Sequence, residues 1–506
     1  MPFLQWVNDD EARRAAKSVP FRLLKEEAVY GDTVQAKENL LIQGDNLDAL
    51  RALLPFYRGK VKCIYIDPPY NTGSAFEHYD DNLEHSQWLS MMMPRLQLLR
   101  EFLTEDGSLW VSIDDDEQAY MKVMLDEVFG RNQHIGTMVW QKRTSPDMRA
   151  TISDGHEYIL AYGINKESFK KVRNCLPLSE EQAKTYKNPD NDPRGPWTSA
   201  DYTAQGFRPN QMYEIKTPGG KIYTPPEGKC WKNVESVFLE QVADGRIWFG
   251  SDGNNLPRRK TFLSEHEGVI PWTWWTNKEV GHSQEAKKEI LTLFGTNNVF
   301  ETPKPERLIQ RILTIATNPG DLVLDSFLGS GTTAAVAHKM GRHYIGIEMG
   351  EHAKTHCIPR LQKVIDGEQG GISKAMNWKG GSGFTFYTLD EPVFDELGLI
   401  NPKVDFKTLA AYLWQRETKE PSVPDYSPYL GSNQGTAYYL LFNGVVSEEN
   451  SAEPNVLTYS VLKSLLEDYP FNGPKVIYAD ACAGISEHEL NKFQVTFKQI
   501  PYDIMQ

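Results

Sequence analysis

The sequence predicts an α/β fold in which a Rossmann-like, largely parallel sheet is interrupted by an inserted domain. Short, nearly continuous apolar runs alternate with helical patterns, which is typical of parallel strands covered on both faces. Five of these runs occur before residue 165, and two more follow only after residue 320. Seven strands are too many for either part of the chain alone, so we expect one sheet with an insertion.

The predicted elements divide the chain into four parts. The expected strands cover residues 39–43, 62–66, 108–113, 134–140, 156–162, 322–325 and 343–347, with helices between several of them, for example over 85–103 and 116–130. We therefore expect the sheet domain to be made of residues 1–165 and 299–386, with an insert at 166–298. A small acidic α/β domain is expected at 387–506, after the glycines at 380–383.

Composition narrows the classes of protein that the chain can belong to. At 506 residues it is too long for a single core, and no run of about 18 apolar residues predicts a membrane span. The five cysteines are scattered and form no CxxC pair, so neither a disulfide framework nor a metal site is predicted. A cytoplasmic location fits this cysteine usage.

The net charge of −14 is unevenly distributed along the chain. The insert holds 19 Lys and Arg residues against 17 Asp and Glu residues, whereas the C-terminal part holds 8 against 17. A polyanion would therefore be bound by the insert rather than by the C-terminal part. The acidity of the C-terminal part favours contact with a protein, for example a second copy of the chain.

A glycine-rich loop follows the strand at 322–325. It contains Gly329 and Gly331 in a GxGxxA pattern, precedes an apolar helix, and lies 19 residues before Glu348 at the end of the next strand. Glycines let the backbone approach a ligand, the helix N-terminus offers free N–H groups, and an acid one strand away can bind a ribose. These features predict a nucleotide-like ligand, with NAD and S-adenosylmethionine as open alternatives.

The strand at 62–66 ends in Asp67-Pro68-Pro69-Tyr70. The Asp67 carboxylate and the Pro68 carbonyl could accept both N–H bonds of an exocyclic amine and aim its lone pair at an electrophile. The prolines would fix the backbone, and Tyr70 would stack on the base. A base in a duplex must be flipped out to reach such a pocket. If this strand lies beside the strand at 322–325, the motif and the glycine loop face one crevice.

Together these motifs resemble those of amino-methylating DNA methyltransferases, in the β-class permutation in which the catalytic motif precedes the cofactor loop. The resemblance implies a circularly permuted S-adenosylmethionine-dependent methyltransferase sheet with a target-recognition insert. It assigns the catalytic role to Asp67, Pro68, Pro69 and Tyr70. The residues that it assigns to the cofactor are Asp45, Thr302, Lys304, Asp325, Phe327, Gly329, Gly331, Thr332 and Glu348.

Three further stretches resemble the modification subunits of type III restriction systems more particularly. They are DPPYNTGS, VGHSQEAKKEI (280–290) and GSGFTFY (381–387). We accordingly expect an adenine-specific, site-specific DNA methyltransferase that acts on double-stranded DNA. A homodimer and a separate restriction subunit, carrying helicase and nuclease, are the candidate protein partners. The basic residues that could contact phosphate are Lys142, Arg143, Arg149, Arg258, Arg259 and Lys260.

Three alternatives remain open at this point. An N4-cytosine methyltransferase would share the motifs, although such enzymes usually carry Ser in place of Asp67. An NAD-dependent oxidoreductase could use the same glycine loop, but it leaves the Asp-Pro-Pro-Tyr motif unexplained. The third alternative is a DNA-binding subunit that has lost its activity.

Overall fold

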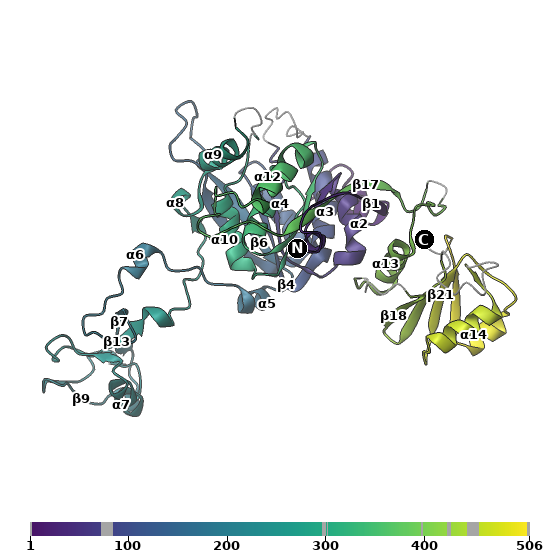
Figure 1. Ribbon diagram of the computed structural model, residues 1–506. Coiled ribbons are helices and arrows are strands. Elements are labelled where there is room, and N and C mark those ends of the chain that lie inside the picture. Colours follow the sequence, from purple (N-terminus) through teal and green to yellow (C-terminus); the bar gives the residue numbers. More distant parts are fainter. Residues whose placement is uncertain are drawn as a thin grey trace. The chain divides into compact units, whose positions relative to one another are not determined.

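The computed structural model describes residues 3–71, 84–295, 300, 302–395, 398–421, 427–442 and 455–502. Thr72, Gly73 and Ser74 of the predicted DPPYNTGS stretch lie outside the described residues. Two compact units are present: Met1–Asn174 together with Trp272–Gln506, and Cys175–Pro271 between them in the chain (Figure 1). No helix among the described residues combines the length and the apolar character that crossing a membrane requires.

The larger unit is built on a ten-stranded mixed sheet in the order β1-β17-β2-β16-β15-β3-β4-β6-β5-β14. Its strands are β1 (Arg22–Gly31), β2 (Leu40–Gln43), β3 (Val61–Ile66), β4 (Leu103–Ile113), β5 (His134–Gln141), β6 (His156–Gly163), β14 (Trp274–Trp275), β15 (Leu322–Asp325), β16 (His343–Glu348) and β17 (Gly383–Pro392). The six strands from β17 to β4 are parallel to one another, whereas β1 and β6 run antiparallel to the strands beside them. The seven predicted strands are all present in this one sheet, so that prediction is confirmed.

The order of the strands reverses between β15 and β3. From β15 the chain continues through a helix to β16 on one side, and from β3 it continues through a helix to β4 on the other. Val323 and Leu324 of β15 pair in parallel with Cys63 and Ile64 of β3. The carboxyl ends of these two strands therefore meet at the point of an open α/β sheet where ligands bind.

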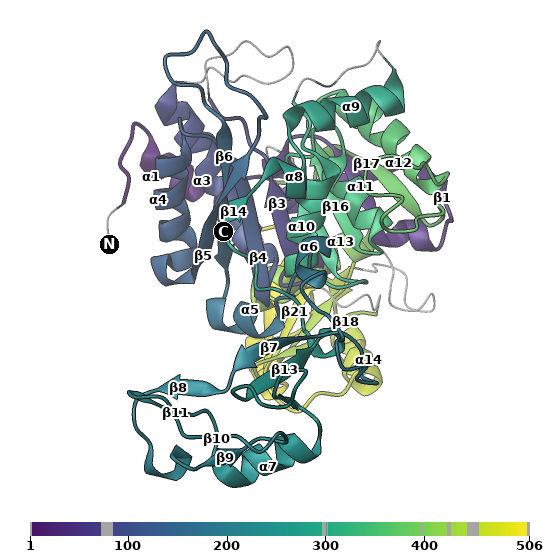
Figure 2. The ribbon, with the colours of Figure 1, turned by 90° about the vertical axis from the view of Figure 1, so that its left-hand side faces the viewer.

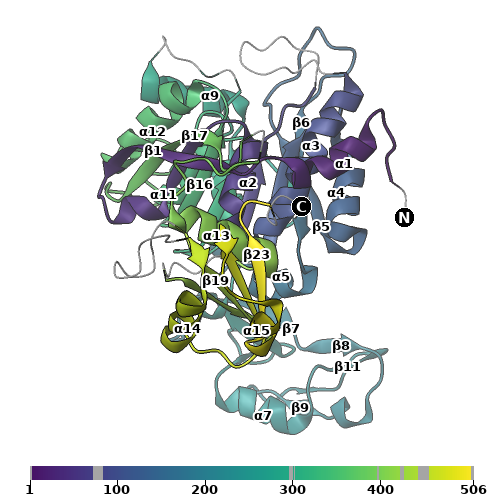
Figure 3. The ribbon, with the colours of Figure 1, turned by 90° about the vertical axis from the view of Figure 1, so that its right-hand side faces the viewer.

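Helices cover both faces of the sheet (Figures 2 and 3). One face carries α2 (Asn46–Tyr57), α3 (His85–Phe102) and α4 (Gln118–Leu125), and the other carries α10 (Glu306–Ala316), α11 (Thr332–Lys339) and α12 (Ile358–Ile365). Buried side chains of the first three helices share a core with Ile64 and Ile66. Because side chains alternate along a strand, the fully buried Cys63 and Tyr65 face the other layer. Continuous apolar strands are the consequence of this double burial.

Three strands of the sheet were not predicted. β1 is an edge strand with three consecutive exposed residues, Lys25–Glu27, so its sequence lacks a buried stripe. β17 pairs with both β1 and β2 and ends at Pro392, so the sheet extends beyond the boundary expected near residue 386. β14 has two residues and pairs with β5.

The compact unit Cys175–Pro271 is narrower than the predicted insert of 166–298. On its N-terminal side, α5 (Lys166–Val172) packs on β4 and β6 in the larger unit, where Phe169 contacts Trp110. On the C-terminal side, α8 (Asn277–Val280) packs on α10, and α9 (Ser283–Phe294) also belongs to the larger unit. The smaller unit has its own aromatic core of Tyr202, Ile215, Trp231, Phe238, Ile247 and Phe249.

The C-terminal part is an α/β structure, as its apolar runs predict. A four-stranded sheet in the order β18-β19-β21-β23 combines Tyr429–Asn433, Thr436–Leu440, Lys475–Ala479 and Val495–Gln499. Helix α14 (Tyr459–Asp468) contributes Leu462 and Leu465 to a core with these strands. A second core joins α13 (Phe406–Thr418) to Phe21 and to Ala52 of α2.

Candidate active site

Acidic side chains follow or end five neighbouring parallel strands at the same edge of the sheet. They are Asp45 after β2, Glu348 in β16, Asp325 in β15, Asp67 after β3 and Asp114 after β4. The parallel pairing brings the carboxyl ends of these strands together. The edge of the sheet at the reversal of strand order is therefore acidic, which suits a ligand that carries positive charge and hydrogen-bond donors.

The glycine loop after β15 is held by the acids on either side of it. Asp325 Oδ1 accepts a hydrogen bond from Phe327 N at 2.9 Å, and Glu348 Oε2 accepts one from Gly329 N at 2.7 Å. Gly329 and Gly331 have φ values of 57° and 81°, in the left-handed region that favours glycine. A Cβ at Gly329 would lie 3.1 Å from the ring of Phe300. Because these two positions carry no side chain, a ligand can approach the backbone of the loop closely. Gly331 is the N-cap of α11, whose first residue is Thr332.

The end of β2 is tied to the same loop. Asp45 caps α2 by accepting a hydrogen bond from Leu47 N at 2.8 Å, and its carboxylate pairs with Arg95 at 2.9 Å. Asn46 Nδ2 donates to the carbonyl of Ser326 at 2.7 Å, which fixes the β2 end relative to the β15 end. The Asp45 side chain is 40% exposed, so its remaining lone pairs can accept hydrogen bonds from a ligand.

The Asp67–Tyr70 segment is fixed from both sides. Trp88 of α3 donates its indole N–H to the Pro69 carbonyl at 2.8 Å. Tyr70 Oη lies 2.7 Å from Asp67 Oδ1 and 3.1 Å from Glu157 Oε2. The aromatic ring of Tyr70 is thus held beside the carboxylate that it follows in the sequence.

Lys304 lies at Asp67 rather than at the glycine loop. Its Nζ donates to both oxygens of Asp67, at 2.8 and 2.6 Å, and lies 3.6 Å from Glu157 Oε2. The ammonium also lies 5.0 Å from the centre of the Tyr70 ring. The segment that carries Thr302, which is exposed, and Lys304 therefore crosses the site at the β3 end.

Burial shifts the acidity of several of these groups. It raises the pKa of Asp67, an effect that Lys304 opposes and the Glu157 carboxylate reinforces. Burial also raises the pKa of Asp325 to about 7 and, aided by Asp116, that of Asp114 to about 7. Burial alone would lower the pKa of Lys304, but Asp67 and Glu157 outweigh it and the net shift is upward. The Lys304 side chain is therefore a charged ammonium at neutral pH.

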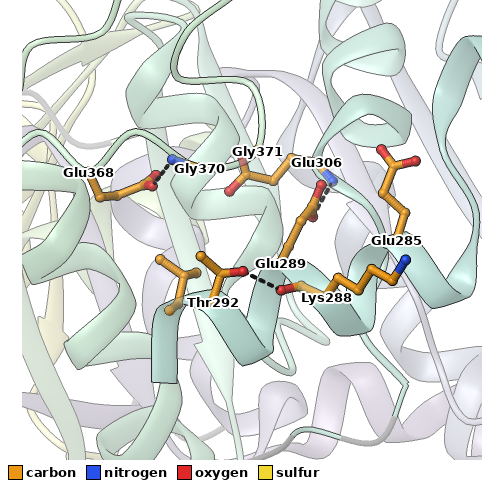
Figure 4. Close-up of a pocket in the computed structure, with 9 residues that line it drawn as sticks. Glu285, Lys288, Glu289, Thr292, Glu306, Glu368, Gly370 and Gly371 are labelled. Carbon is orange, nitrogen blue, oxygen red and sulfur yellow. Dashed lines mark hydrogen bonds between the residues drawn. The ribbon is translucent and has the colours of Figure 1, made fainter. Parts of the chain in front are cut away.

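Helix α9, which contains most of the VGHSQEAKKEI stretch, supports the segment that carries Lys304. Glu285 binds Arg307 through two contacts of 2.7 Å, and Glu289 Oε2 accepts a hydrogen bond from Glu306 N at 3.1 Å. Figure 4 shows Glu289 pointing at the backbone nitrogen of Glu306. Both residues line a cavity of about 180 Å³ together with Glu368, Gly370 and Gly371. This stretch thus fixes residues 304–307 from behind the site.

Glu289 makes the stability of the protein depend on pH. Burial and the neighbouring Glu306 carboxylate raise its pKa to about 7, so the folded chain binds a proton that the unfolded chain releases near pH 4.5. The free energy of unfolding of the wild-type protein should therefore decrease as the pH rises from about 4.5 to about 7. We expect Glu289→Gln, which keeps an acceptor for Glu306 N, to be more stable than wild type by about 1–2 kcal/mol at pH 8.

Urea unfolding of both proteins at pH 4.5 and pH 8 measures this effect. The advantage of Glu289→Gln should nearly vanish at pH 4.5, where the wild-type side chain is protonated in the folded state and about half protonated in the unfolded state. An equal difference at the two pH values would show that Glu289 titrates normally.

The six basic residues predicted to contact phosphate have unlike environments. Arg143, Arg149 and Arg259 are exposed, and Arg149 pairs with Asp147 two residues away. Lys142 is 12% exposed and pairs with Asp154 and Glu157. Arg258 binds Ser199 and Asp201, and Lys260 is buried between Asp190 and Asp192. Phosphate would have to displace carboxylates to reach Lys142 or Lys260, so the exposed arginines are the better candidates.

A group of potential metal ligands occurs near the site but not within it. Asp115, Asp154 and His156 place ligand atoms within 4.8 Å of one another. Asp154 is already paired with Lys142 at 2.7 Å, and both aspartates are exposed. We interpret this group as a surface ion-pair cluster and assign no metal to it.

The sequence analysis did not single out Glu157, which is only 8% exposed and contacts both Tyr70 and Lys304. One signal was available: Glu157 is a charged residue within the apolar run HEYILAY. A charge in a buried strand requires a partner, and this indicates a function or an ion pair. The partner, Lys304, is 147 residues away in the chain and has no sequence pattern that links it to Glu157.

Comparisons with known proteins agree with the geometry. Residues 61–358 match a family model described as DNA methylase. The probable type III restriction-modification enzyme HindVI Mod subunit of Haemophilus influenzae is 32% identical over 75% of this chain and 58% of its own length. The StyLTI Mod subunit of Salmonella typhimurium is 34% identical over 65% of this chain and 55% of its own length. The chain thus spans a little over half the length of these two relatives.

A solved structure of a putative DNA modification methylase from Thermus thermophilus, in complex with S-adenosyl-L-methionine, covers 70% of this chain and 100% of its own. It is 17% identical, and the TM-score is 0.35.

Proposed function

The chain belongs to the DNA methylase family, and from this premise we propose that it transfers a methyl group from S-adenosylmethionine to the N6 amine of a flipped adenine in double-stranded DNA. The observation that carries the proposal is the meeting of the Asp67–Tyr70 segment and the glycine loop at the ends of the paired strands β3 and β15. The Mod subunits that resemble the chain support a site-specific enzyme of a type III restriction-modification system.

The Asp-Pro-Pro-Tyr segment provides what an aromatic amine needs to react. The N6 lone pair is delocalised into the ring, so the amine is a weak nucleophile until both of its N–H bonds are held. We assign one N–H to the Asp67 carboxylate and the other to the Pro68 carbonyl. Pro69 is anchored by Trp88, and Tyr70 provides a face for stacking. Asp in the first position favours adenine over cytosine.

The residues around the glycine loop fit the methyl donor. When bound, S-adenosylmethionine supplies an electrophilic methyl group on a sulfonium. Glu348 accepts hydrogen bonds from Gly329 N and Gly350 N, which place its carboxylate beside the glycine loop, and we assign the ribose hydroxyls to this carboxylate. We assign adenosine and methionine contacts to Asp45, Asp325, Phe327, Gly329, Gly331 and Thr332. We place the exposed Thr302 at the entrance, and Lys304 beside Asp67 where the methionine moiety would approach. The acidity of this edge complements the sulfonium.

Transfer of a tritiated methyl group to sequence-diverse DNA tests the function. Labelled DNA is expected with S-adenosylmethionine and wild-type protein, and calorimetry should show binding of S-adenosylmethionine but not of NAD. Tight NAD binding without S-adenosylmethionine binding would favour an oxidoreductase. DNA binding without label would identify an inactive DNA-binding subunit.

We further propose that the unit Cys175–Pro271 recognises the target sequence, with Arg259 contacting phosphate and with Arg143 and Arg149 contacting phosphate from the larger unit. The exposure of these arginines supports the proposal. Replacing Arg149 or Arg259 by Ala should weaken DNA binding and flatten the dependence of log Kd on log salt by about one unit each. Lys463→Ala, an exposed change in α14, is the control. Unchanged salt slopes in both arginine variants would remove these residues from the interface.

The remaining partners stay predictions. A homodimer and a separate restriction subunit suit a modification subunit, and the acidic C-terminal part is the candidate surface for a protein. Light scattering of the purified chain, alone and mixed with a candidate restriction subunit, tests both. A monomer that forms no complex would contradict them.

A further inference from the structure

Two carboxylates share one phenol in the site. Tyr70 Oη lies within hydrogen-bond distance of Asp67 Oδ1, at 2.7 Å, and of Glu157 Oε2, at 3.1 Å. A phenol has a single proton to donate, so it can donate to only one of these carboxylates at a time. The arrangement connects Asp67 to Glu157 through a group that can both give and accept a proton.

The charges of this network are matched to the proposed reaction. Asp67 and Glu157 carry two negative charges, and Lys304, which contacts both, carries one positive charge. The Tyr70 phenol stays neutral, because burial and the Asp67 charge raise its pKa well above the ordinary value. The network is thus net negative by one charge. A methylated N6 is positive by one charge until it loses a proton.

The net negative charge of the network depends on Glu157. If it were neutral, Lys304 would pair with Asp67 alone, and the cation forming at N6 would meet a network without net charge. A second cation, Lys142, lies 3.5 Å from Glu157, but its charge is balanced by Asp154 at 2.7 Å. This pair therefore leaves the net charge of the network unchanged. Asp114 and Asp325 are further acids near this network: the Asp114 charge interacts with Glu157 and Lys142, and the Asp325 charge interacts with Asp67.

On the basis of the proposed function, we infer that Glu157 is a positioning residue for methyl transfer that holds Lys304 and receives the reaction's proton through Tyr70. The N6 lone pair forms the N–C bond while the C–S bond of the methyl donor breaks and its electron pair stays on sulfur. The cationic N6 then gives one proton to Asp67. Asp67 passes it to Tyr70 Oη as Tyr70 gives its own proton to Glu157. Asp67 ends ionised beside Lys304, and Glu157 ends neutral.

Glu157→Gln tests the inference, because it keeps the shape of the side chain and removes the charge and the proton acceptor. Single-turnover methylation should slow by roughly 10- to 100-fold. In the plot of methylation rate against pH, the acidic limb of the variant should lie at lower pH than that of wild type. The reason is that the Glu157 charge, which the variant lacks, raises the pKa of Asp67. The matched control is Asp154→Asn, which removes a carboxylate that also pairs with Lys142 but does not touch Tyr70. It should stay within twofold of wild type with an unmoved profile.

Tyr70→Phe separates the proton path from a structural role of Glu157. If protons pass through the phenol, the double variant Tyr70→Phe/Glu157→Gln should be no slower than the slower single variant. Multiplicative effects, or a Glu157→Gln rate within twofold of wild type, would overturn the inference while leaving the proposed function intact. A wild-type protein that methylates no DNA would overturn both.

Discussion

Replacing Asp67 by Ala is expected to lower the single-turnover rate of DNA methylation by about 10³-fold. Asp67 provides the acceptor that holds one N–H of the target amine, and its charge opposes the cation that forms at N6. The side chain touches Lys304 and Tyr70, whereas the glycine loop after β15 is held by Asp325 and Glu348. Binding of S-adenosylmethionine, measured by calorimetry, should therefore stay within about threefold of wild type.

Asp67→Asn is the matched variant for this prediction. It keeps one acceptor oxygen and the size of the side chain but loses the charge. It should retain more activity than Asp67→Ala and less than wild type. An Asp67→Ala protein that keeps more than a tenth of the wild-type rate would contradict the assigned role.

The second large effect is expected on stability, at Glu306. This carboxylate is 1% exposed, accepts two bonds from Lys339 at 2.9 and 2.8 Å, and binds Arg360 at 2.9 Å. Burial alone would raise its pKa, but Arg360 and Lys339 outweigh burial and the net shift is downward. Glu306→Ala would leave two buried cations without this partner. We expect it to cost about 3–5 kcal/mol of unfolding free energy at pH 7.

Urea unfolding measures the loss, with Glu467→Ala as the control. Glu467 pairs with Lys463 on the exposed surface of α14, so its replacement should change stability by less than about 1 kcal/mol. Because the pKa of Glu306 is lowered on folding, its contribution is present above about pH 4.5 and is lost as pH falls below that value. Equal losses at Glu306 and Glu467 would show that the buried cluster contributes no more than a surface pair.

The sequence predicts well those parts of the fold whose two faces are both buried. β3 and β15 appear as continuous apolar runs, because helices cover both sides of the sheet. β1 does not, because an edge strand with charged residues is defined by its pairing with β17, more than 350 residues later. The insert was predicted too wide for a related reason. α5 and α9 have no pattern that distinguishes packing on the sheet from packing in the insert.

The candidate site also combines residues with a local sequence motif and residues that only long-range packing brings together. Asp67 and the glycine loop have local motifs, so their identities and the strand ends that carry them were predictable, and the adjacency of β3 and β15 supplies the rest. No such motif predicts the contact of Lys304 with Asp67 or the contacts of Glu157 with Lys304 and Tyr70. Lys304 is 237 residues away from Asp67, and only the tertiary structure brings its ammonium to the carboxylate. Long-range charge pairing of this kind leaves no periodic trace in a sequence.

The chemical identity of the modified base tests the central claim most directly. DNA incubated with the protein and S-adenosylmethionine can be digested to nucleosides and separated by mass spectrometry. The account predicts N6-methyladenosine in its deoxy form, absent when Asp67→Ala replaces the wild-type protein. N4-methylcytosine in its place, or DNA without any methylated nucleoside, would contradict it.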